Sequence, residues 1–149
     1  MALFFFLGAV ALTALFGSRF EPGPWYEPLA KAPWTPPNWV FAPAWTLLYV
    51  AIAIAGWLAW RSRVRSSELM ALWFGQLALN GAWSWLFFGR HDVALALVDI
   101  ALLVVAAGAF AVRARASSRA ASWLFVPYVL WLGYAASLNF YVWRYNAAG

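Results

Sequence analysis

The segment WYEPLAKAPWTPPNWVFAPAW (residues 25–45) decides how the rest of the chain is interpreted. It holds four tryptophans and five of the chain's eight prolines, and apolar runs long enough to cross a bilayer lie on both sides of it. Each proline fixes φ, removes a backbone donor and pushes the preceding residue towards extended geometry. We therefore expect a stiff, partly extended lid at residues 21–36, which leads into a spanning helix near Pro36 and Pro37.

The composition is that of an integral membrane protein. The 149 residues are 66% hydrophobic and only 10% charged, with a mean hydropathy of +0.72, whereas a soluble domain is roughly 25% charged. The net charge of +5 comes from arginines between the apolar runs, and no basic helix indicates nucleic-acid binding. With no cysteine and a single histidine, His91, the sequence predicts no disulfide, no metal site and no required cofactor.

The apolar runs predict an all-α integral membrane protein, a bundle of five transmembrane helices with a structured Trp/Pro-rich first loop. Each run is close to the roughly 20 residues that a spanning helix needs. A signal peptide is the alternative for the first run, because Ala9-Val10-Ala11 resembles a cleavage site, but no Lys or Arg precedes it. We expect one domain, 1–149, with spans at about 2–20, 37–60, 68–88, 93–112 and 122–143.

The arginines predict the orientation of the chain in the membrane. The second and fourth loops hold six arginines, and the lid, the third loop and the C-terminus hold four basic residues. Because basic residues accumulate in cytoplasmic loops, we expect the second and fourth loops inside and the lid outside.

Polar side chains inside the predicted spans fall on three helix faces, at spacings of three and four residues. If these faces converge, they form an apolar cavity with indole N–H donors, an amide and a phenol, which suits a large, flat, hydrophobic ligand. The alternative is that the same groups only join helices through hydrogen bonds of roughly 0.6–2 kcal/mol each. The faces are Gln76, Asn80, Ser84 and Phe87; Trp45, Tyr49 and Ile52; and Tyr128, Trp131, Ala135 and Leu138.

Asp99 is the one acidic residue well inside a predicted span. Its insertion into a bilayer costs about 2.5–3.5 kcal/mol, so it needs a partner or a role. A proton relay normally uses several acids or histidines, and the other predicted spans lack them well inside. A neutral or hydrogen-bonded structural role is therefore favoured for Asp99.

Small residues recur on the third predicted span as Ala71/Gly75 and Ala78/Ala82. Such pairs let helices approach closely, either between two copies of the chain in a homodimer or inside one bundle. Both alternatives remain open from the sequence.

The C-terminal run carries Leu138, Tyr141 and Arg144, which satisfy the loose cholesterol-contact pattern. An aromatic residue followed by arginine at a helix end is also typical of an interfacial anchor, and this interpretation is favoured. Phosphate-binding glycine loops, GxSxG elbows and paired carboxylates are all absent from the sequence.

Taken together, the residues resemble the tryptophan-rich sensory proteins, the bacterial relatives of the mitochondrial translocator protein (peripheral benzodiazepine receptor). The resemblance covers nearly the whole chain. The motifs that carry it are WYEPLAKAPWTPPNWVFAPAW at 25–45, LNGAWSWLFFG at 79–89, ALALVDIALL at 94–103 and VPYVLWLGYAASLNFYVWRYN at 126–146.

This resemblance implies a five-helix bundle, often a homodimer, which binds porphyrins, sterols and benzodiazepine-type ligands under its first loop. By motif, Trp45 and Trp131 match the tryptophans associated with ligand binding and with light- and oxygen-dependent porphyrin breakdown. They are the candidate catalytic residues if the protein has such an activity. Asn80 and Ala135 match pocket positions. The expected ligand-binding residues are Tyr26, Trp34, Pro36, Pro37, Trp45, Tyr49, Asn80, Ser84, Tyr128, Trp131, Ala135 and Leu138.

The expected function is that of a membrane receptor, sensor or carrier for protoporphyrin IX-type tetrapyrroles and other flat hydrophobic ligands. The alternatives are a light- and oxygen-dependent porphyrin-degrading activity, outside the conventional enzyme classes, and a transporter of sterol, lipid or porphyrin. We expect the bacterial cytoplasmic membrane as the location, with the outer membrane as the alternative.

Two positions depart from the family pattern. Lys31 is followed by Ala32 before Pro33, where the family commonly has Lys-Pro. The tyrosine that follows Leu-Asn in animal members is Phe140 here, and Tyr141 lies about 100° further round the helix. The candidate sterol-motif residues are therefore Leu138, Phe140, Tyr141 and Arg144.

Overall fold

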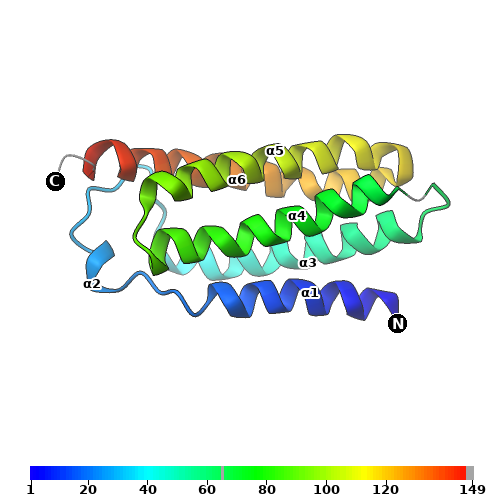
Figure 1. Ribbon diagram of the computed structural model, residues 1–149, viewed down its shortest axis with the longest axis horizontal. Coiled ribbons are helices and arrows are strands. Elements are labelled where there is room, and N and C mark those ends of the chain that lie inside the picture. The colour runs from blue at the N-terminus through cyan, green and yellow to red at the C-terminus, as the bar shows by residue number, and fades with distance from the viewer. Residues whose placement is uncertain (65, 147–149) are drawn as a thin grey trace.

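The computed structural model describes residues 1–64 and 66–146, and these residues form an all-helical bundle (Figure 1). Besides the α-helices there is one 3-10 turn, η1, and one π-helical turn, η2. In chain order the elements are α1 (Ala2–Gly17), α2 (Gly23–Tyr26), η1 (Asn38–Val40), α3 (Phe41–Arg61), α4 (Ser67–Ser84), η2 (Trp85–Gly89), α5 (Val93–Ser117) and α6 (Arg119–Asn146).

The prediction of five spans is not confirmed by helix length and composition. Within the described residues, three helical stretches are long and apolar enough to cross a membrane: Asn38–Arg61, Val93–Ser117 and Arg119–Asn146. Helix α1 has 16 residues, fewer than the roughly 20 that a span needs. Helix α4 is also short, with 18 residues, and contains the polar residues Glu68, Gln76 and Asn80.

The number of helices also differs from the prediction. The described residues hold six α-helices rather than five, because a single turn, α2, forms inside the lid. This turn begins at Gly23, whose φ of 59° is accessible to glycine at little cost, and a proline occupies its first turn. The lid is therefore partly helical as well as partly extended.

Helices α5 and α6 extend beyond the predicted spans. Helix α5 continues to Ser117 rather than ending near 112, and α6 begins at Arg119 rather than near 122. Alanine and arginine are good helix formers, so a charged residue limits the apolar stretch without ending the helix. The break falls at Ser118, which has an extended backbone with φ −158° and ψ 113°.

The helices pack in a definite order, and different segments of the chain lie at the two ends of the bundle. Helix α5 packs against α4 and α6, and α3 packs against α1 and α6. The N-terminus lies at the same end as the α3–α4 and α5–α6 connections, while the lid and the C-terminus lie at the other end (Figure 1). The arginine-rich loops are therefore remote from the lid; Arg65, one of their arginines, lies outside the described residues.

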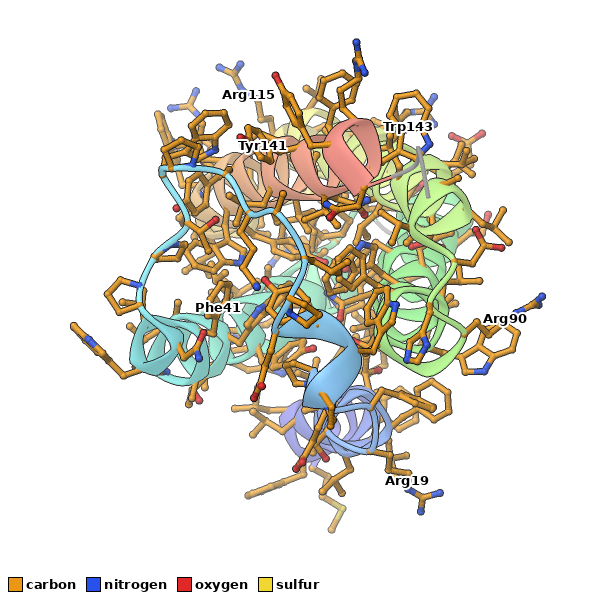
Figure 2. All side chains as sticks on the ribbon, turned by 90° about the vertical axis from the view of Figure 1, so that its left-hand side faces the viewer. Arg19, Phe41, Arg90, Arg115, Tyr141 and Trp143 are labelled. Carbon is orange, nitrogen blue, oxygen red and sulfur yellow. The ribbon has the colours of Figure 1, made fainter. Side chains whose placement is uncertain are left out.

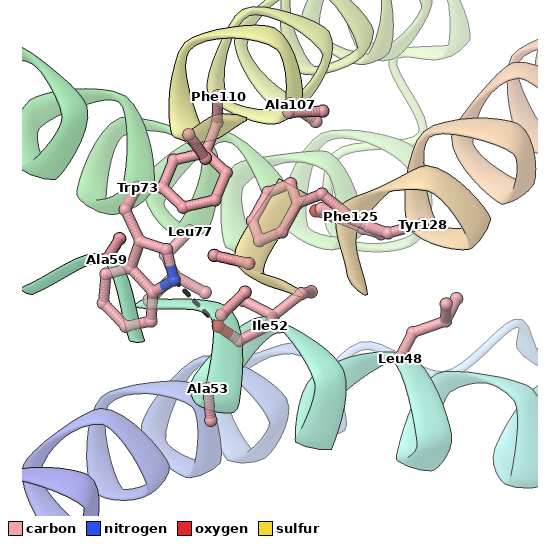
Figure 3. Close-up of a cluster of buried hydrophobic side chains, with 14 of the residues drawn as sticks. Leu48, Ile52, Ala53, Ala59, Trp73, Leu77, Ala107, Phe110, Phe125 and Tyr128 are labelled. Atoms are coloured by element: carbon pink, nitrogen blue, oxygen red, sulfur yellow. Dashed lines mark hydrogen bonds between the residues drawn. The ribbon is translucent and has the colours of Figure 1, made fainter. Parts of the chain in front are cut away.

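A core of buried hydrophobic side chains lies between the helices of the bundle (Figure 3). Trp73 is fully buried and its Nε1 donates a hydrogen bond to the backbone oxygen of Ile52, at 2.9 Å. Gly56 makes this approach possible, because a Cβ at that position would lie 2.4 Å from Trp73 Nε1. The rings of Phe110 and Phe125, also fully buried, have centroids 4.2 Å apart.

Candidate functional site

A chain of hydrogen bonds connects α3, α4 and α6 in the interior of the bundle. The Tyr49 hydroxyl donates to Asn80 Oδ1 at 2.8 Å, and Asn80 Nδ2 donates to the Tyr128 hydroxyl at 2.9 Å. The Tyr128 hydroxyl donates in turn to Gln76 Oε1 at 2.8 Å. Asn80, Tyr128 and Gln76 are buried, and Tyr49 is half-buried. The chain thus leads from a partly accessible phenol to a fully enclosed amide.

Aromatic rings from α3 and α6 form a wall beside this polar chain. The Trp45 ring lies 5.4 Å from Tyr49 and 6.4 Å from Tyr128, measured between centroids. It meets the Trp131 ring edge to face, at 6.2 Å and 86°. The Phe41 and Trp131 rings also meet edge to face, with centroids 6.0 Å apart. Trp45 and Trp131 are both only half-buried, so part of each side chain is exposed.

Three buried polar atoms in this region have no hydrogen-bond partner among the described residues: Gln76 Nε2, Asp99 Oδ2 and Trp131 Nε1. An unpaired buried polar group costs about 1–3 kcal/mol. Asp99 on α5 is only 7% exposed, and its carboxyl group interacts electrostatically with Tyr128. Two donors and one carboxyl oxygen of the interior thus have no hydrogen-bond partner within the described residues.

The lid is attached to α6 by side-chain hydrogen bonds. Ala30 exchanges two hydrogen bonds with the Asn146 amide, since its N–H donates to Oδ1 and its backbone oxygen accepts from Nδ2, both at 2.9 Å. Trp34 Nε1 donates to Ser137 Oγ at 3.1 Å, and the Tyr134 hydroxyl donates to the backbone oxygen of Trp34 at 2.5 Å. These contacts fix the second half of the lid across the end of the bundle (Figure 2).

The first half of the lid packs on the π-helical turn η2 and on the connection that follows it. The Trp25 ring stacks on His91 at 4.1 Å and 7° and meets Phe87 edge to face at 5.9 Å. Tyr26 meets Phe88 edge to face at 5.5 Å, and the Lys31 ammonium lies 4.4 Å from the Tyr26 ring centroid. Burial raises the pKa of the Tyr26 phenol above its ordinary value.

The structure brings together five of the residues expected to bind a ligand: Trp45, Tyr49, Asn80, Tyr128 and Trp131. Ala135 and Leu138, one and two turns beyond Trp131 on α6, are half-buried. In the lid, Tyr26 and Trp34 contact the bundle as described, Pro36 is half-buried, and the exposed Pro37 precedes the η1 turn.

Ser84 does not join this group. A Cβ at Gly17 on α1 would lie 3.2 Å from Ser84 Oγ, which places the Ser84 side chain against α1. The face shared by Gln76 and Asn80 points towards α3 and α6 instead. An α-helix has 3.6 residues per turn, so residues spaced by four, such as Gln76, Asn80 and Ser84, lie progressively further round the helix. After two turns Ser84 therefore points in another direction than Gln76.

Several residues of the site were not selected from the sequence. Gln76 was recognised only as part of a polar face, although it ends the hydrogen-bond chain. Tyr134, Ser137 and Asn146, which hold the lid, were not selected. The first two share one face of α6 with Tyr141, whose ring meets Trp34 edge to face at 5.6 Å. Their spacing of three and four residues was the signal available in the sequence.

The sterol-motif residues lie at the lid end of α6. Leu138 is half-buried, Phe140 is 51% exposed and Arg144 is exposed. Tyr141 rests against Trp34 of the lid.

The small-residue face of α4 points out of this bundle over most of its length. Ala71, Gly75 and Ala78 are exposed, and a Cβ at Gly75 would meet nothing within 4 Å. Ala82 is half-buried.

These features define a class of protein: a helical membrane protein with a tryptophan-lined interior, closed at one end by a proline-rich loop. The sequence profile of the TspO/MBR family matches residues 2–144, and the chain belongs to this family. The resemblance seen in the sequence is thereby confirmed.

Relatives in three different organisms show the extent of the similarity. The chain is 40% identical over 145 residues to the translocator protein of Homo sapiens, covering 93% of this chain and 86% of that protein. It is 43% identical over 140 residues to the tryptophan-rich protein TspO of Archaeoglobus fulgidus, with coverage of 93% and 91%. It is 38% identical over 143 residues to the tryptophan-rich sensory protein of Cereibacter sphaeroides, with coverage of 95% and 89%.

Proposed function

We propose that this chain is a membrane receptor, sensor or carrier that binds a porphyrin, or another flat hydrophobic ligand, between α3, α4 and α6 beneath the lid. The names of its relatives, translocator protein and tryptophan-rich sensory protein, are consistent with such a role. In this proposal the porphyrin is a ligand rather than a required cofactor.

The observation that carries the proposal is the pair of unpartnered N–H donors beside two half-buried tryptophans. Among residues 1–64 and 66–146, Trp131 Nε1 and Gln76 Nε2 lack partners, while the hydroxyls of Tyr49 and Tyr128 are already engaged. A porphyrin offers a flat π-face that packs on indole rings, and it carries acceptor groups that these donors can satisfy.

The lid completes the proposed site as its cover. Its contacts with α6 and η2 hold it over the end at which Phe41, the first residue of α3, lies (Figure 2). A ligand that enters from this end must displace Trp34 or Trp25 from their partners, so the lid contacts govern the rate of exchange. Loops that close over a ligand commonly have this gating role.

In the membrane, we propose that α1 and α4 cross the bilayer together with α3, α5 and α6. Helix α4 continues directly into η2, which extends it to Gly89, and α1 is apolar from Ala2 to Gly17. The bacterial cytoplasmic membrane, with the arginine-rich loops inside, fits the charge distribution. The outward-facing small residues Ala71, Gly75 and Ala78 support a homodimer through α4.

A titration of the detergent-purified protein with protoporphyrin in darkness tests the proposal. We expect saturable quenching of tryptophan fluorescence with a shift of the Soret band, and weaker binding in Trp131→Phe and Asn80→Ala. Trp123→Phe is the matched control, because Trp123 on α6 is 71% exposed and lies outside the proposed site. Absence of saturable binding, or equal weakening in the control, would contradict the proposal.

Light-dependent porphyrin breakdown is a second candidate function. The specific observation in its favour is the edge-to-face contact of Trp45 and Trp131, which places two oxidisable rings beside the same proposed ligand. The same sample, illuminated in the presence of oxygen, separates the two functions. Binding alone leaves the Soret band in place, whereas breakdown bleaches it, and Trp45→Phe or Trp131→Phe slows the bleaching.

A transporter is the third candidate, and the same residues would line its path. Reconstituted vesicles loaded with porphyrin distinguish it from a receptor. Release of porphyrin across the bilayer that depends on Trp131 and Asn80 supports transport, and retention supports a receptor.

A further inference from the structure

A hollow lies at the end of the bundle opposite the lid, between α1, α3 and α4. Its volume is about 460 Å³, within the range of ligand pockets, and aromatic rings form most of its wall. Phe6 and Trp60 lie 6.4 Å apart on one side, and Phe5 meets Phe74 edge to face at 6.3 Å on the other. The complete lining is Ala2, Phe5, Phe6, Trp60, Met70 and Phe74.

This apolar hollow is open to the surroundings of the bundle. Three of its lining side chains are exposed: Phe5 by 61%, Phe74 by 44% and Trp60 by 40%. In a membrane protein such a surface faces lipid, and an apolar chain can enter it sideways from the bilayer.

A smaller hollow of about 200 Å³ adjoins the first and shares Trp60 and Met70 with it. Its remaining lining is Ala59, Ser66 and Ser67, so it adds hydroxyl groups and the first turn of α4. Ser66 caps that helix by accepting a hydrogen bond from Leu69 N–H at 3.2 Å. The N-terminus of a helix favours negative charge. Along α4, Ser66 and Phe74 are eight residues apart, or about 12 Å.

Two arginines lie close in the chain to the lining of the smaller hollow. Arg61 follows Trp60 directly, with its guanidinium 4.6 Å from the centroid of the Trp57 ring, and Arg63 lies in the connection between Trp60 and Ser66. The nearest acid, Glu68, is already engaged in an ion pair with Arg113. A basic site beside an apolar groove matches a molecule with a negative head and an apolar tail.

We infer that these joined hollows bind an anionic phospholipid, with an acyl chain against Phe5, Phe74 and Trp60 and the phosphate near Ser66 and Ser67. Arg61 and Arg63 select the negative headgroup. Basic pockets between membrane helices bind acidic headgroups in this way. The inference is independent of the porphyrin proposal, because no residue of this groove belongs to the site beneath the lid.

Native mass spectrometry of the detergent-purified protein, with phosphatidylglycerol and phosphatidylcholine of identical acyl chains, tests the inference. We expect preferential retention of phosphatidylglycerol, and roughly ten-fold weaker retention of it in the double variant Arg61→Gln/Arg63→Gln. The control Arg115→Gln/Arg119→Gln removes the same charge at the same end, but from α5 and α6, which do not line the groove.

The apolar part of the groove has its own pair of variants. Phe74→Ala opens the wall of the larger hollow and weakens both lipids, whereas Trp123→Ala removes an exposed ring from α6, outside the groove, and leaves both unchanged. Thermal unfolding of each variant in detergent checks that the bundle stays folded. Equal retention of the two lipids by the wild-type protein, equal loss in both arginine pairs, or equal behaviour of Phe74→Ala and Trp123→Ala would each overturn the inference.

Discussion

Trp73 and Trp131 both face the interior of the bundle, but their indole N–H groups have opposite environments. Trp73 is fully buried and its Nε1 is bonded to Ile52 at 2.9 Å, with Gly56 leaving space for the ring. Trp131 is half-buried and its buried Nε1 has no partner within the described residues. The two tryptophans look alike in the sequence, but the fold gives a hydrogen-bond partner to the indole N–H of only one of them within the described residues.

The neighbours of the two tryptophans also differ. Around Trp73 lie alanines and the Phe110–Phe125 pair, so the interior is apolar and packed. Around Trp131 lie Trp45 and Tyr128, with the amides of α4 bonded to Tyr128. A protein that only needed to hold its helices together would gain nothing from unpaired donors in one half. We propose that the contrast separates a core that stabilises the fold from an interior arranged for a ligand.

The largest expected effect is on stability, from Trp73→Ala. The variant creates a cavity and frees the Ile52 oxygen, and we expect a loss of about 3–5 kcal/mol. Trp131→Ala, at a half-buried position whose indole N–H has no hydrogen bond to another described residue, is expected to cost less than about 2 kcal/mol. Reversible unfolding in mixed detergent measures both. Equal losses in the two variants would remove the distinction between core and site.

The next effect concerns the hydrogen-bond chain. Tyr128→Phe deletes the hydroxyl that joins Asn80 to Gln76 and leaves both amides short of a partner, at a cost of about 1–3 kcal/mol. Tyr49→Phe removes only a terminal donor and is expected to cost about 0.6 kcal/mol. The ranking is measured by unfolding of both single variants and the double variant. A larger loss in Tyr49→Phe would mean that the chain is not organised around Tyr128.

A smaller effect is expected from the lid. Asn146→Ala removes both hydrogen bonds to Ala30, so the lid opens more often and porphyrin dissociates roughly three- to ten-fold faster. Stopped-flow displacement of bound porphyrin measures the rate. Trp39→Phe is the control, because Trp39 in η1 is 74% exposed. An unchanged rate in Asn146→Ala would show that the ligand leaves by another route.

The smallest effect on stability is expected from Asp99→Asn. Because Asp99 Oδ2 has no partner within the described chain, exchanging the carboxyl for a neutral amide of the same shape breaks no hydrogen bond of that oxygen there. We expect a stability within about 1 kcal/mol of the wild type or above it, since an amide is easier to bury than a charge. A large loss on thermal unfolding would instead reveal an essential partner for the carboxyl.

Much of this arrangement could be predicted from the sequence. The apolar runs located α1, α3, α4, α5 and α6 to within a few residues at most ends, although not which of them are long enough to span a membrane, and the prolines located the lid. Helical register placed Tyr49, Asn80 and Tyr128 on faces that do converge. These successes share one cause, since the hydrophobic pattern of a helix determines which side is buried.

The rest depended on tertiary contacts that periodicity does not encode. The lid is held through backbone atoms of Ala30 and Trp34, which any residue carries, so the sequence gives no sign of where they bind. The π-helical turn at Trp85–Gly89 alters the direction of Phe87 and Phe88 relative to a regular helix, which a register argument cannot anticipate. Charged residues indicated where the apolar stretches end. They did not indicate the end of α5 or the start of α6, because both helices continue past them.

The central claim is that Trp131 offers its indole N–H to a ligand while Trp73 does not. Two-dimensional NMR of the protein with 15N-labelled indoles tests it directly during a protoporphyrin titration in darkness. Single Trp→Phe variants at the two positions assign the signals. We predict a large, saturable shift of the Trp131 Nε1–H signal and an unchanged Trp73 signal. Equal shifts at both positions, or saturable binding without a change at Trp131, would contradict the claim.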